Sequence, residues 1–467
     1  MEVGALLLSR SARTTARVVL LFVFAVTFVF AVTSDAVPLA PTTLPWSWDR
    51  ASVFIHGCQC SRVLLNATEL AYVAKYHIAV IEKGHGVEET GLFMADSNIP
   101  RVARQIKAAN PETWVLFYQN PALDFLLYEL HHAAVAAETS GAQPFGVNTD
   151  GTPSMTFVAN EFPVGGACTD AAQNYPTGLR IFNMSDAKLR SLFVESCTNA
   201  TDTGYVDGCH VDRANWAERL AQEGGDHAQG GHQHSNINWT ATQANGLAAG
   251  EKLVMAALQV AVGPERLISA KENPTLGLMN DFLRANTMYM EDCWMQGYAA
   301  LQDRISNMSR VEFNKTLALM HYELQVAIDT AARGQVTLMH GCGPLEAGDR
   351  LNPSCAHGDC ISEFNFTFAA YLCAAGNNSY FSYARNADDG SAMGQGAWEL
   401  RSYGLKWWPQ YDMPLGAPTG PAKRDWLNPE TNQIDPDVYR RTFATGTVVW
   451  VNLRTRTGII HPIGPPL

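Results

Sequence analysis

Short apolar runs recur along this chain between residues 52 and 372, and longer segments separate them. The runs are continuous rather than alternating, which is typical of strands buried on both faces of a parallel sheet. The segments 245–262 and 309–332 space their apolar residues as helices do. This order constrains the fold to one built from repeated strand–helix units. The runs are Ser52–His56, Ile78–Glu82, Trp114–Tyr118, Tyr205–Val211, Leu267–Lys271, Thr287–Glu291, Gln335–His340 and Phe366–Leu372.

Eight such runs predict an α/β fold with a closed (β/α)8 barrel of the TIM type over residues 49–405. An open doubly wound sheet is the alternative, but no run is followed by the glycine-rich turn that binds dinucleotide phosphates. The last run, 366–372, suits a helix equally well. Residues 406–467 contain a further strong strand, Thr447–Leu453, and we expect them to form a small β-containing tail packed on the barrel.

The amino terminus has the pattern of an export signal. Three arginines, the last of them Arg17, precede an apolar stretch from Val18 to Val32. A basic region followed by about 7–15 apolar residues is typical of a signal peptide, and a membrane span needs roughly 18. Residues 1–35 therefore predict a signal peptide, with an uncleaved membrane anchor as the alternative, and 36–48 a linker. We expect the chain to be secreted or to lie in the lumen of the secretory pathway.

Cysteines and glycosylation sequons agree with export. The ten cysteines are an even number, which favours disulfide bonds in an oxidising compartment, and buried free thiols are the alternative. Eight Asn-x-Ser/Thr sequons predict glycans on the surface. They lie at Asn66, Asn183, Asn199, Asn238, Asn307, Asn314, Asn365 and Asn377.

The charge of the chain excludes one class of partner. The net charge is −12, whereas a protein that binds a nucleic-acid backbone needs a basic face. We therefore expect no nucleic-acid partner. Apolar residues make up 47% of the chain, which is enough to build a large core.

Polar residues gather where the predicted strands end. In a barrel of this type the reactive side chains stand at the carboxyl ends of the strands. Aromatic rings stack on sugar rings, and carboxylates and amides bind hydroxyl groups, so these ends predict a carbohydrate substrate, an oligo- or polysaccharide. Asp207 is included although it starts its strand, a position that favours a structural role. The candidate substrate-binding residues are Glu82, Lys83, Tyr118, Asn120, Asp207, Arg213, Glu272, Asn273, Asp292 and His340.

Hydrolysis of a glycosidic bond needs two carboxyl groups, one as an acid and one as a nucleophile or base. Asp212 is the first candidate, because the period of two along its strand places it on one face with His210. A helix N-cap or an ion pair with Arg213 is its structural alternative. Glu291 follows an apolar run, where burial would raise its pKa as an acid catalyst requires. A surface carboxylate that opens a helix is its alternative, and Glu272 is the rival acid.

Several longer segments together resemble the hypothetical glycosyl hydrolase family 15, a group of barrel proteins related to the α-amylase and α-galactosidase groups. The resemblance spans most of the chain from 52 to 452 and implies a barrel that hydrolyses O-glycosidic bonds. It also implies that the fourth-strand carboxylate, Asp212, is the nucleophile and that Glu291, on a later strand, is the acid. The long insertion 143–179 and the loop 221–242 depart from the family. The segments that carry the resemblance are Val80–Lys83, Ala108–Asn120, Val206–Trp216, Met288–Trp294, Tyr411–Pro418 and Tyr439–Asn452.

Two other functions remain open at this stage. A glycan-binding barrel without catalysis would keep the aromatic and amide side chains but needs no acid. A metal-dependent hydrolase would use His227, His232 and His234, which lie in a glycine-rich loop. Because catalytic metal sites favour rigid elements, we expect these histidines to be incidental, and we expect no metal or other cofactor.

Overall fold

The structure is a computed structural model, and its description covers thirteen stretches of the chain. The predicted signal segment lies outside them. The described residues are 41–57, 64–82, 94–158, 179–214, 233–235, 237–272, 286–290, 294–295, 309–343, 359–385, 407–424, 426–428 and 432–462.

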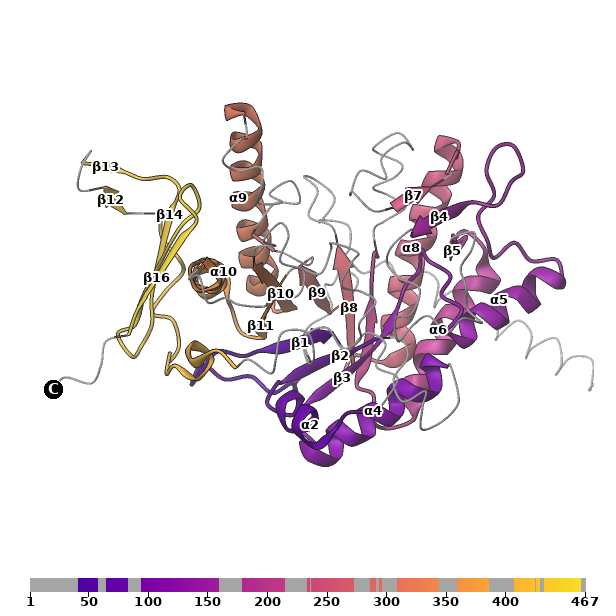
Figure 1. Ribbon diagram of the computed structural model, residues 1–467, viewed down its shortest axis with the longest axis horizontal. Coiled ribbons are helices and arrows are strands. Elements are labelled where there is room, and N and C mark those ends of the chain that lie inside the picture. Colours follow the sequence, from indigo (N-terminus) through magenta and orange to yellow (C-terminus); the bar gives the residue numbers. More distant parts are fainter. Residues whose placement is uncertain are drawn as a thin grey trace, which may run out of the picture. The chain divides into compact units, whose positions relative to one another are not determined.

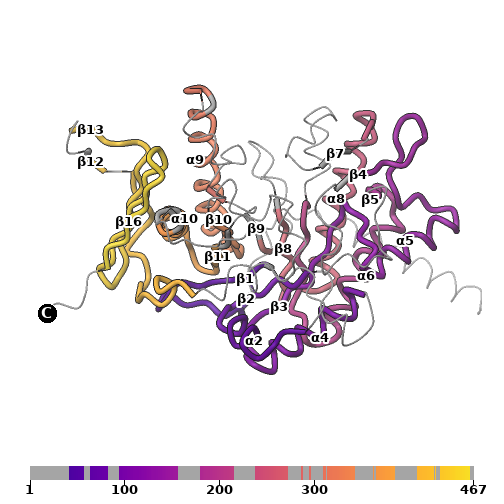
Figure 2. The backbone as a smooth tube through the Cα atoms, viewed as in Figure 1, coloured from indigo at the N-terminus to yellow at the C-terminus, as the bar shows by residue number. Residues whose placement is uncertain are grey.

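Eight strands form one parallel sheet in the order β1-β2-β3-β6-β8-β9-β10-β11. An isolated parallel bridge joins Val53 to Phe381, and the Phe381 N–H donates to the Ser52 carbonyl at 2.9 Å. The sheet therefore curls until its first and last strands meet, as Figure 2 shows for indigo β1 and orange β11. The strands are β1 (Phe54–Gly57), β2 (Ile78–Ile81), β3 (Trp114–Gln119), β6 (Gly208–Val211), β8 (Leu267–Glu272), β9 (Thr287–Met290), β10 (Val336–Gly343) and β11 (Ser379–Arg385).

Helices cover the outside of the curled sheet (Figure 1). In three of them, side chains fix the first turn by accepting hydrogen bonds from backbone N–H groups. Asp186 caps α6 in this way, and Asn66 and Thr240 begin capping boxes at α2 and α8. The barrel prediction is confirmed. The helices are α2 (Ala67–Val73), α4 (Ala95–Ala109), α5 (Glu129–Thr139), α6 (Ala187–Asp202), α8 (Ala241–Val262), α9 (Arg310–Ala332) and α10 (Asp359–Ala374).

The prediction of the last strand, residues 366–372, is wrong. Residues 366–372 lie inside helix α10, and the eighth strand is β11, which begins at Ser379. The aromatic residues Phe364, Phe368 and Tyr371 are three or four positions apart, so they stack along one face of the helix. This helical spacing outweighs the β propensity of the individual residues.

The barrel interior is apolar at its amino-terminal end. Side chains from six of the strands pack there in one cluster, and each aliphatic side chain buried in this way contributes roughly 1.5–3 kcal/mol. Leu44, from the end of the predicted linker, joins this cluster, and Trp46 packs against it. The cluster comprises Leu44, Phe54, Ile78, Val80, Trp114, Leu116, Leu267, Val336, Leu338 and Tyr380.

Strand β6 is fixed in two ways at its amino-terminal half. A Cβ atom on Gly208 would collide with the Leu267 carbonyl of β8, so only glycine lets the two strands approach. The next residue, Cys209, forms a disulfide with Cys197 of α6. One predicted disulfide is thus present, whereas Cys373 of α10 is a buried free thiol.

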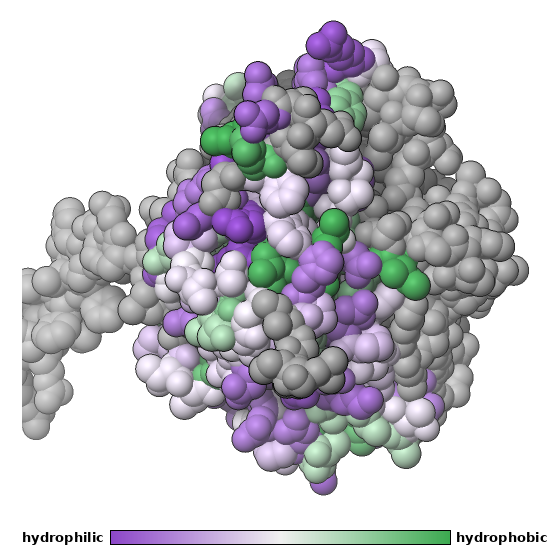
Figure 3. Space-filling model, turned by 90° about the vertical axis from the view of Figure 1, so that its left-hand side faces the viewer, coloured by the Kyte–Doolittle hydropathy of each residue, from purple (hydrophilic) through white to green (hydrophobic). Residues whose placement is uncertain are grey.

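The C-terminal residues form an antiparallel sheet, β14-β15-β16, against the outer side of α10 (Figure 1). Gly458 of β16 lies against the Asn365 carbonyl of α10, too close for any Cβ atom. Hydrophilic residues interrupt the apolar ones on the side of the molecule that carries this sheet (Figure 3). The elements are η6 (Pro409–Asp412), β12 (Leu427–Asn428), β13 (Gln433–Ile434), β14 (Val438–Thr442), β15 (Val448–Asn452) and β16 (Thr457–His461).

A second small antiparallel sheet arises from the insertion and the loop that depart from the family pattern. Its order is β5-β4-β7, with bounds Leu179–Arg180, Met155–Val158 and Gln233–Ser235. Among the described residues, no helix combines the length and the apolar character that crossing a membrane requires.

Candidate active site

Polar side chains replace the apolar cluster at the carboxyl end of the barrel. Parallel strands present all their carboxyl ends at one mouth, so residues far apart in sequence meet there. The mouth contains three histidines, two carboxylates, a lysine, a tyrosine and an amide. These residues are His56, Glu82, Tyr118, Asn120, His210, Asp212, Lys271 and His340.

Asp212 is contacted by side chains and backbone from two neighbouring strands. It directly follows β6, and its N–H donates to the Gln119 carbonyl of β3 at 2.9 Å. Its Oδ2 atom accepts from the Tyr118 hydroxyl at 2.6 Å and from Asn120 Nδ2 at 3.2 Å. Lys271 Nζ of β8 lies 3.3 Å from the other oxygen, Oδ1. Three strands thus position one carboxylate.

The two oxygens of Asp212 are used differently. Oδ2 accepts two hydrogen bonds, whereas Oδ1 is buried and accepts none from the residues described. The ammonium group of Lys271 lies beside Oδ1 and offsets its charge. A buried carboxylate oxygen without a hydrogen bond is rare in folded proteins.

Electrostatics keep Asp212 ionised. Burial alone would raise the pKa of this carboxyl, but the charges of Lys271 and Arg213 and the Tyr118 hydroxyl hold it well below its usual range. Burial, and then the charge of Asp212, raises the pKa of Tyr118 well above its ordinary value. Tyr118 therefore keeps its proton, and its hydroxyl donates a hydrogen bond to the carboxylate.

The turn after Asp212 is tight. Arg213 has φ +53°, in the left-handed region that non-glycine residues rarely adopt. The Ala214 N–H donates to the Lys271 carbonyl at 3.0 Å, which ties this turn to β8. The backbone thus holds Lys271 and Asp212 side by side, in addition to their opposite charges.

A second pair lies beside this carboxylate. His56 Nε2 is 2.5 Å from Glu82 Oε1, and both side chains are buried. The His56 ring lies 4.9 Å from that of His210, whose Nδ1 lies 3.1 Å from the Ser269 hydroxyl. Burial, and then the charge of His56, lowers the pKa of His210 to about 3, so this imidazole is neutral.

The predicted site residues divide into three groups. The structure brings Glu82, Tyr118, Asn120, Asp212 and His340 together at the mouth, with Arg213 next to Asp212 in the chain. Glu272 is the last residue of β8. The others, Lys83, Asn273, Glu291 and Asp292, lie outside the described residues.

Asp207 lies at the opposite, amino-terminal end of β6. Its Oδ2 accepts from the Val115 N–H at 2.7 Å and pairs with Lys107 Nζ at 2.7 Å. The structure therefore does not bring Asp207 to the mouth, and its contacts are those of a residue that joins β3, β6 and α4.

The sequence interpretation missed three contributors, His56, His210 and Lys271. His56 ends the first predicted strand and Lys271 the fifth, so the rule that named the other residues applies equally to them. The contact of each with a carboxylate depends on which strands become neighbours, and this is not readable from a single strand.

The histidine loop is only partly covered by the description. His227 and His232 lie outside the described residues, and His234 is the middle residue of β7, opposite Phe157 of β4. Within the described ranges, no group of three or more histidine, cysteine, aspartate or glutamate residues could hold a metal ion.

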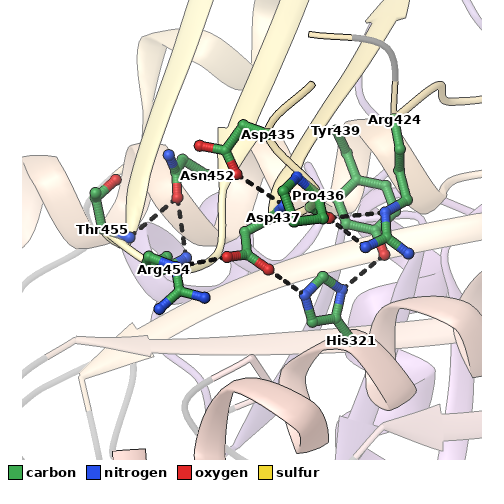
Figure 4. A network of polar contacts seen from close by, with 9 residues as sticks. All are labelled: His321, Arg424, Asp435, Pro436, Asp437, Tyr439, Asn452, Arg454 and Thr455. Atoms are coloured by element: carbon green, nitrogen blue, oxygen red, sulfur yellow. Dashed lines mark hydrogen bonds and ion pairs between the residues drawn. The ribbon is translucent and has the colours of Figure 1, made fainter. Parts of the chain in front are cut away.

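A third polar cluster lies between α9 and the C-terminal sheet (Figure 4). Asp437 Oδ1 pairs with His321 Nε2 at 2.9 Å, and its Oδ2 pairs with Arg454 Nε at 2.6 Å. The other ring nitrogen of His321 lies 2.9 Å from the Tyr439 hydroxyl. Both oxygens of this carboxylate are therefore occupied, which suits a structural contact.

Comparison with protein families gives one match. The model described as hypothetical glycosyl hydrolase family 15 matches residues 107–447, most of the chain. The resemblance inferred from the sequence motifs is thereby confirmed. No curated protein sequence matches the chain.

Solved structures give weaker likenesses. A GH31-family sulfoquinovosidase from E. rectale matches with 10% identity and a TM-score of 0.41, covering 76% of this chain and 46% of that one. An α-N-acetylgalactosaminidase from Bifidobacterium bifidum has 11% identity, a TM-score of 0.43 and coverages of 92% and 61%. An α-amylase from Malbranchea cinnamomea matches with 8% identity and a TM-score of 0.43, covering 87% of this chain and 85% of that one. The chain spans 46%, 65% and 57% of the first three solved chains that match it. These likenesses do not assign an activity to this chain.

Proposed function

This chain belongs to hypothetical glycosyl hydrolase family 15, and from that premise we propose that it hydrolyses O-glycosidic bonds with Asp212 as the reacting carboxylate. The supporting observation is the unequal use of its two oxygens. Tyr118 and Asn120 fix Oδ2, while Oδ1 is buried and accepts no hydrogen bond from the described residues. An ionised carboxylate held in this way is pre-organised to face the positive charge that develops on a sugar ring.

We propose Glu291 as the acid. It directly follows β9, whose Thr287 pairs with Ser269 of β8 and is buried. Side chains alternate along a strand. Continuing the alternation of β9, we expect Glu291 on the same face as Thr287, just as Lys271 shares a face with Ser269 in β8. On this basis we expect the Glu291 carboxyl to face the barrel mouth that contains Asp212.

The reaction then follows from the two roles. Glu291 donates its proton to the glycosidic oxygen as the bond from that oxygen to C1 breaks. Asp212 Oδ1 either attacks C1 and forms a glycosyl ester, which a water deprotonated by Glu291 then hydrolyses, or takes a proton from a water that attacks C1. A carboxyl separation of about 5–5.5 Å gives retention of configuration and about 6.5–9.5 Å gives inversion.

A panel of α- and β-linked oligosaccharides tests this proposal with the full chain expressed through a secretory pathway. We expect the wild type to cleave at least one member, and Asp212→Asn and Glu291→Gln to lose that cleavage while remaining folded. Asp202→Asn, an exposed carboxylate at the end of α6, is the matched control and should behave as wild type. Full activity in either of the first two variants removes that residue from the mechanism.

A glycan-binding barrel without catalysis is the second candidate function, and one observation favours it. Asp212 forms a buried ion pair with Lys271, and such a pair stabilises a carboxylate in its resting state. Calorimetric titration of the panel decides between the two. Binding without turnover by the wild type supports the second function, and turnover rejects it.

We also propose that the chain folds in an oxidising compartment and carries glycans there. The disulfide Cys197–Cys209 and five exposed sequon asparagines support this. Asn183 and Asn365 are partly buried, and Gly458 lies directly against the Asn365 carbonyl. Enzymatic deglycosylation in ¹⁸O-water with mass spectrometry should label the exposed sites and leave Asn365 unlabelled. Full occupancy of Asn365 contradicts the packing of β16 on α10. The exposed sites are Asn66, Asn199, Asn238, Asn314 and Asn377.

A further inference from the structure

A strained, buried turn follows β9 at residues 294–295. Trp294 and Met295 are almost completely buried. Met295 has φ +69°, in the left-handed region, and the buried Trp294 indole N–H has no hydrogen-bond partner among the residues that the structure describes. Both features are unfavourable, and such conformations persist only where surrounding contacts enforce them.

Two hydrogen bonds enforce this turn, one on each residue. The Trp294 N–H donates to the carbonyl of His340 at 2.9 Å, which ties the turn to the barrel mouth. The Met295 N–H donates to Glu323 Oε2 of α9 at 2.9 Å. Glu323 is 2% exposed, so a side chain that normally lies in water is buried in the core, where it accepts a hydrogen bond from a backbone amide.

Helix α9 is itself held from another side. His321 precedes Glu323 by two residues, which is about 200° around a helix at 100° per residue. The two side chains therefore leave α9 in nearly opposite directions, with His321 toward Asp437 of the C-terminal sheet and Glu323 toward the turn. Figure 4 shows the His321 side of this arrangement.

We propose that Glu323 is a positioning residue, which fixes the turn after β9 and thereby the mouth of the barrel around His340. The inference rests on the proposed function, because the same turn begins three residues after Glu291, the expected acid. Catalytic geometry must be held within a fraction of an ångström. Glu323 provides this restraint from outside the site, without touching substrate.

The protonation state of Glu323 agrees with this role. Burial raises the pKa of Glu323 to about 8, against smaller opposing effects of the Met295 N–H and the Arg456 charge. A raised carboxyl pKa means that the neutral form is favoured in the folded state, so the restraint is complete at low pH and weakens as pH rises through about 8. Above that pH, a buried charge favours opening of the turn.

Two substitutions at Glu323 test the proposal. Glu323→Gln keeps an acceptor for the Met295 N–H and removes the titration, whereas Glu323→Leu removes the acceptor. We expect Glu323→Leu to lower kcat about 10- to 100-fold with little change in KM, and Glu323→Gln to stay within about 3-fold of wild type. Gln325→Leu, an exposed position on the same helix, is the control and should change neither parameter.

Two further measurements, hydrogen exchange of the Met295 amide and the dependence of kcat on pH, test the same proposal by other means. Exchange of the Met295 amide should be faster in Glu323→Leu than in wild type and Glu323→Gln. The wild-type kcat should fall above pH 8, and Glu323→Gln should lack this fall. The proposal is overturned if Glu323→Leu exchanges its Met295 amide at the wild-type rate and has the wild-type kcat. If the wild type cleaves nothing, the proposed function fails, and the exchange comparison still decides whether Glu323 holds the turn.

Discussion

Asp212 at the barrel mouth and Asp437 beside α9 are both buried aspartates, each paired with a cation and close to a tyrosine. In Asp437, His321 and Arg454 occupy both oxygens. In Asp212, two donors share Oδ2 and none of the described residues donates to Oδ1. Burial opposes ionisation in both, yet their partners hold both pKa values below the usual range.

The difference separates a carboxylate whose contacts suit a structural role from the one that we propose reacts. A buried group is most stable when every lone pair is satisfied. Asp437 meets this condition, so its substitution should affect stability. Asp212 lacks part of this stabilisation, because none of the described residues donates to Oδ1. An active site is expected to stabilise the transition state more than the resting protein, often at such a cost to local stability.

The largest contrast is expected in activity. Asp212→Asn should lower kcat/KM by more than about 10³-fold, because it removes the group that reacts. Asp437→Asn should keep kcat/KM within about 3-fold of wild type, since its contacts lie outside the mouth. Initial rates on the best oligosaccharide of the panel measure both. Equal losses in the two variants would remove the distinction drawn between them.

Lys271→Met should produce the next largest effect. Without this charge the pKa of Asp212 rises toward its ordinary value, because Lys271 is the largest influence that opposes burial. A neighbouring opposite charge typically shifts a carboxyl pKa by about 1–3 units. The acidic limb of the profile of kcat/KM against pH should therefore move to higher pH. An unmoved limb would show that Lys271 does not control the ionisation of Asp212.

Asp437→Asn should instead lower stability, by about 1–3 kcal/mol at neutral pH. The folded-state pKa of Asp437 is depressed, so its contribution is present above the ordinary aspartate value and disappears as pH falls through the folded-state value. Wild type and variant should therefore converge in acid. Thermal unfolding between pH 3 and pH 7 checks this, and a constant difference across that range contradicts it.

Tyr118→Phe should lower kcat/KM less than Asp212→Asn does. It removes one of the two hydrogen bonds on Oδ2 and leaves Asn120 in place. The net value of such a bond to a charged group is about 1.5–3 kcal/mol, which corresponds to roughly 10- to 100-fold in kcat/KM. The loss should be greatest at acidic pH, where the higher pKa of Asp212 matters. A loss as large as that of Asp212→Asn would give Tyr118 a role in the chemistry itself.

Much of the fold follows from local sequence patterns. Seven of the eight apolar runs are barrel strands because each is a continuous apolar segment between helices. The strand predicted at 366–372 is wrong because a buried helix and a buried strand of that length have similar apolar sequence patterns. The true strand, β11, contains two serines and ends in an arginine, so it is not a continuous apolar run, and it follows α10 after the four-residue connection 375–378.

The candidate site was predictable only in part. The position of Asp212 at the end of its strand follows from the period of two. Its partners do not, because Tyr118, Asn120 and Lys271 come from strands that become neighbours only when the sheet forms. The same limit applies to Glu323, whose contact with Met295 joins a helix to a turn 28 residues away.

Azide rescue of Asp212→Ala tests the central claim most directly. The smaller side chain leaves room for an anion beside Lys271, so azide should restore cleavage of a glycoside with a good leaving group. The product should be a glycosyl azide, identified by mass spectrometry. Cleavage by Asp212→Ala at the wild-type rate, independent of azide and without the azide adduct, would contradict the account.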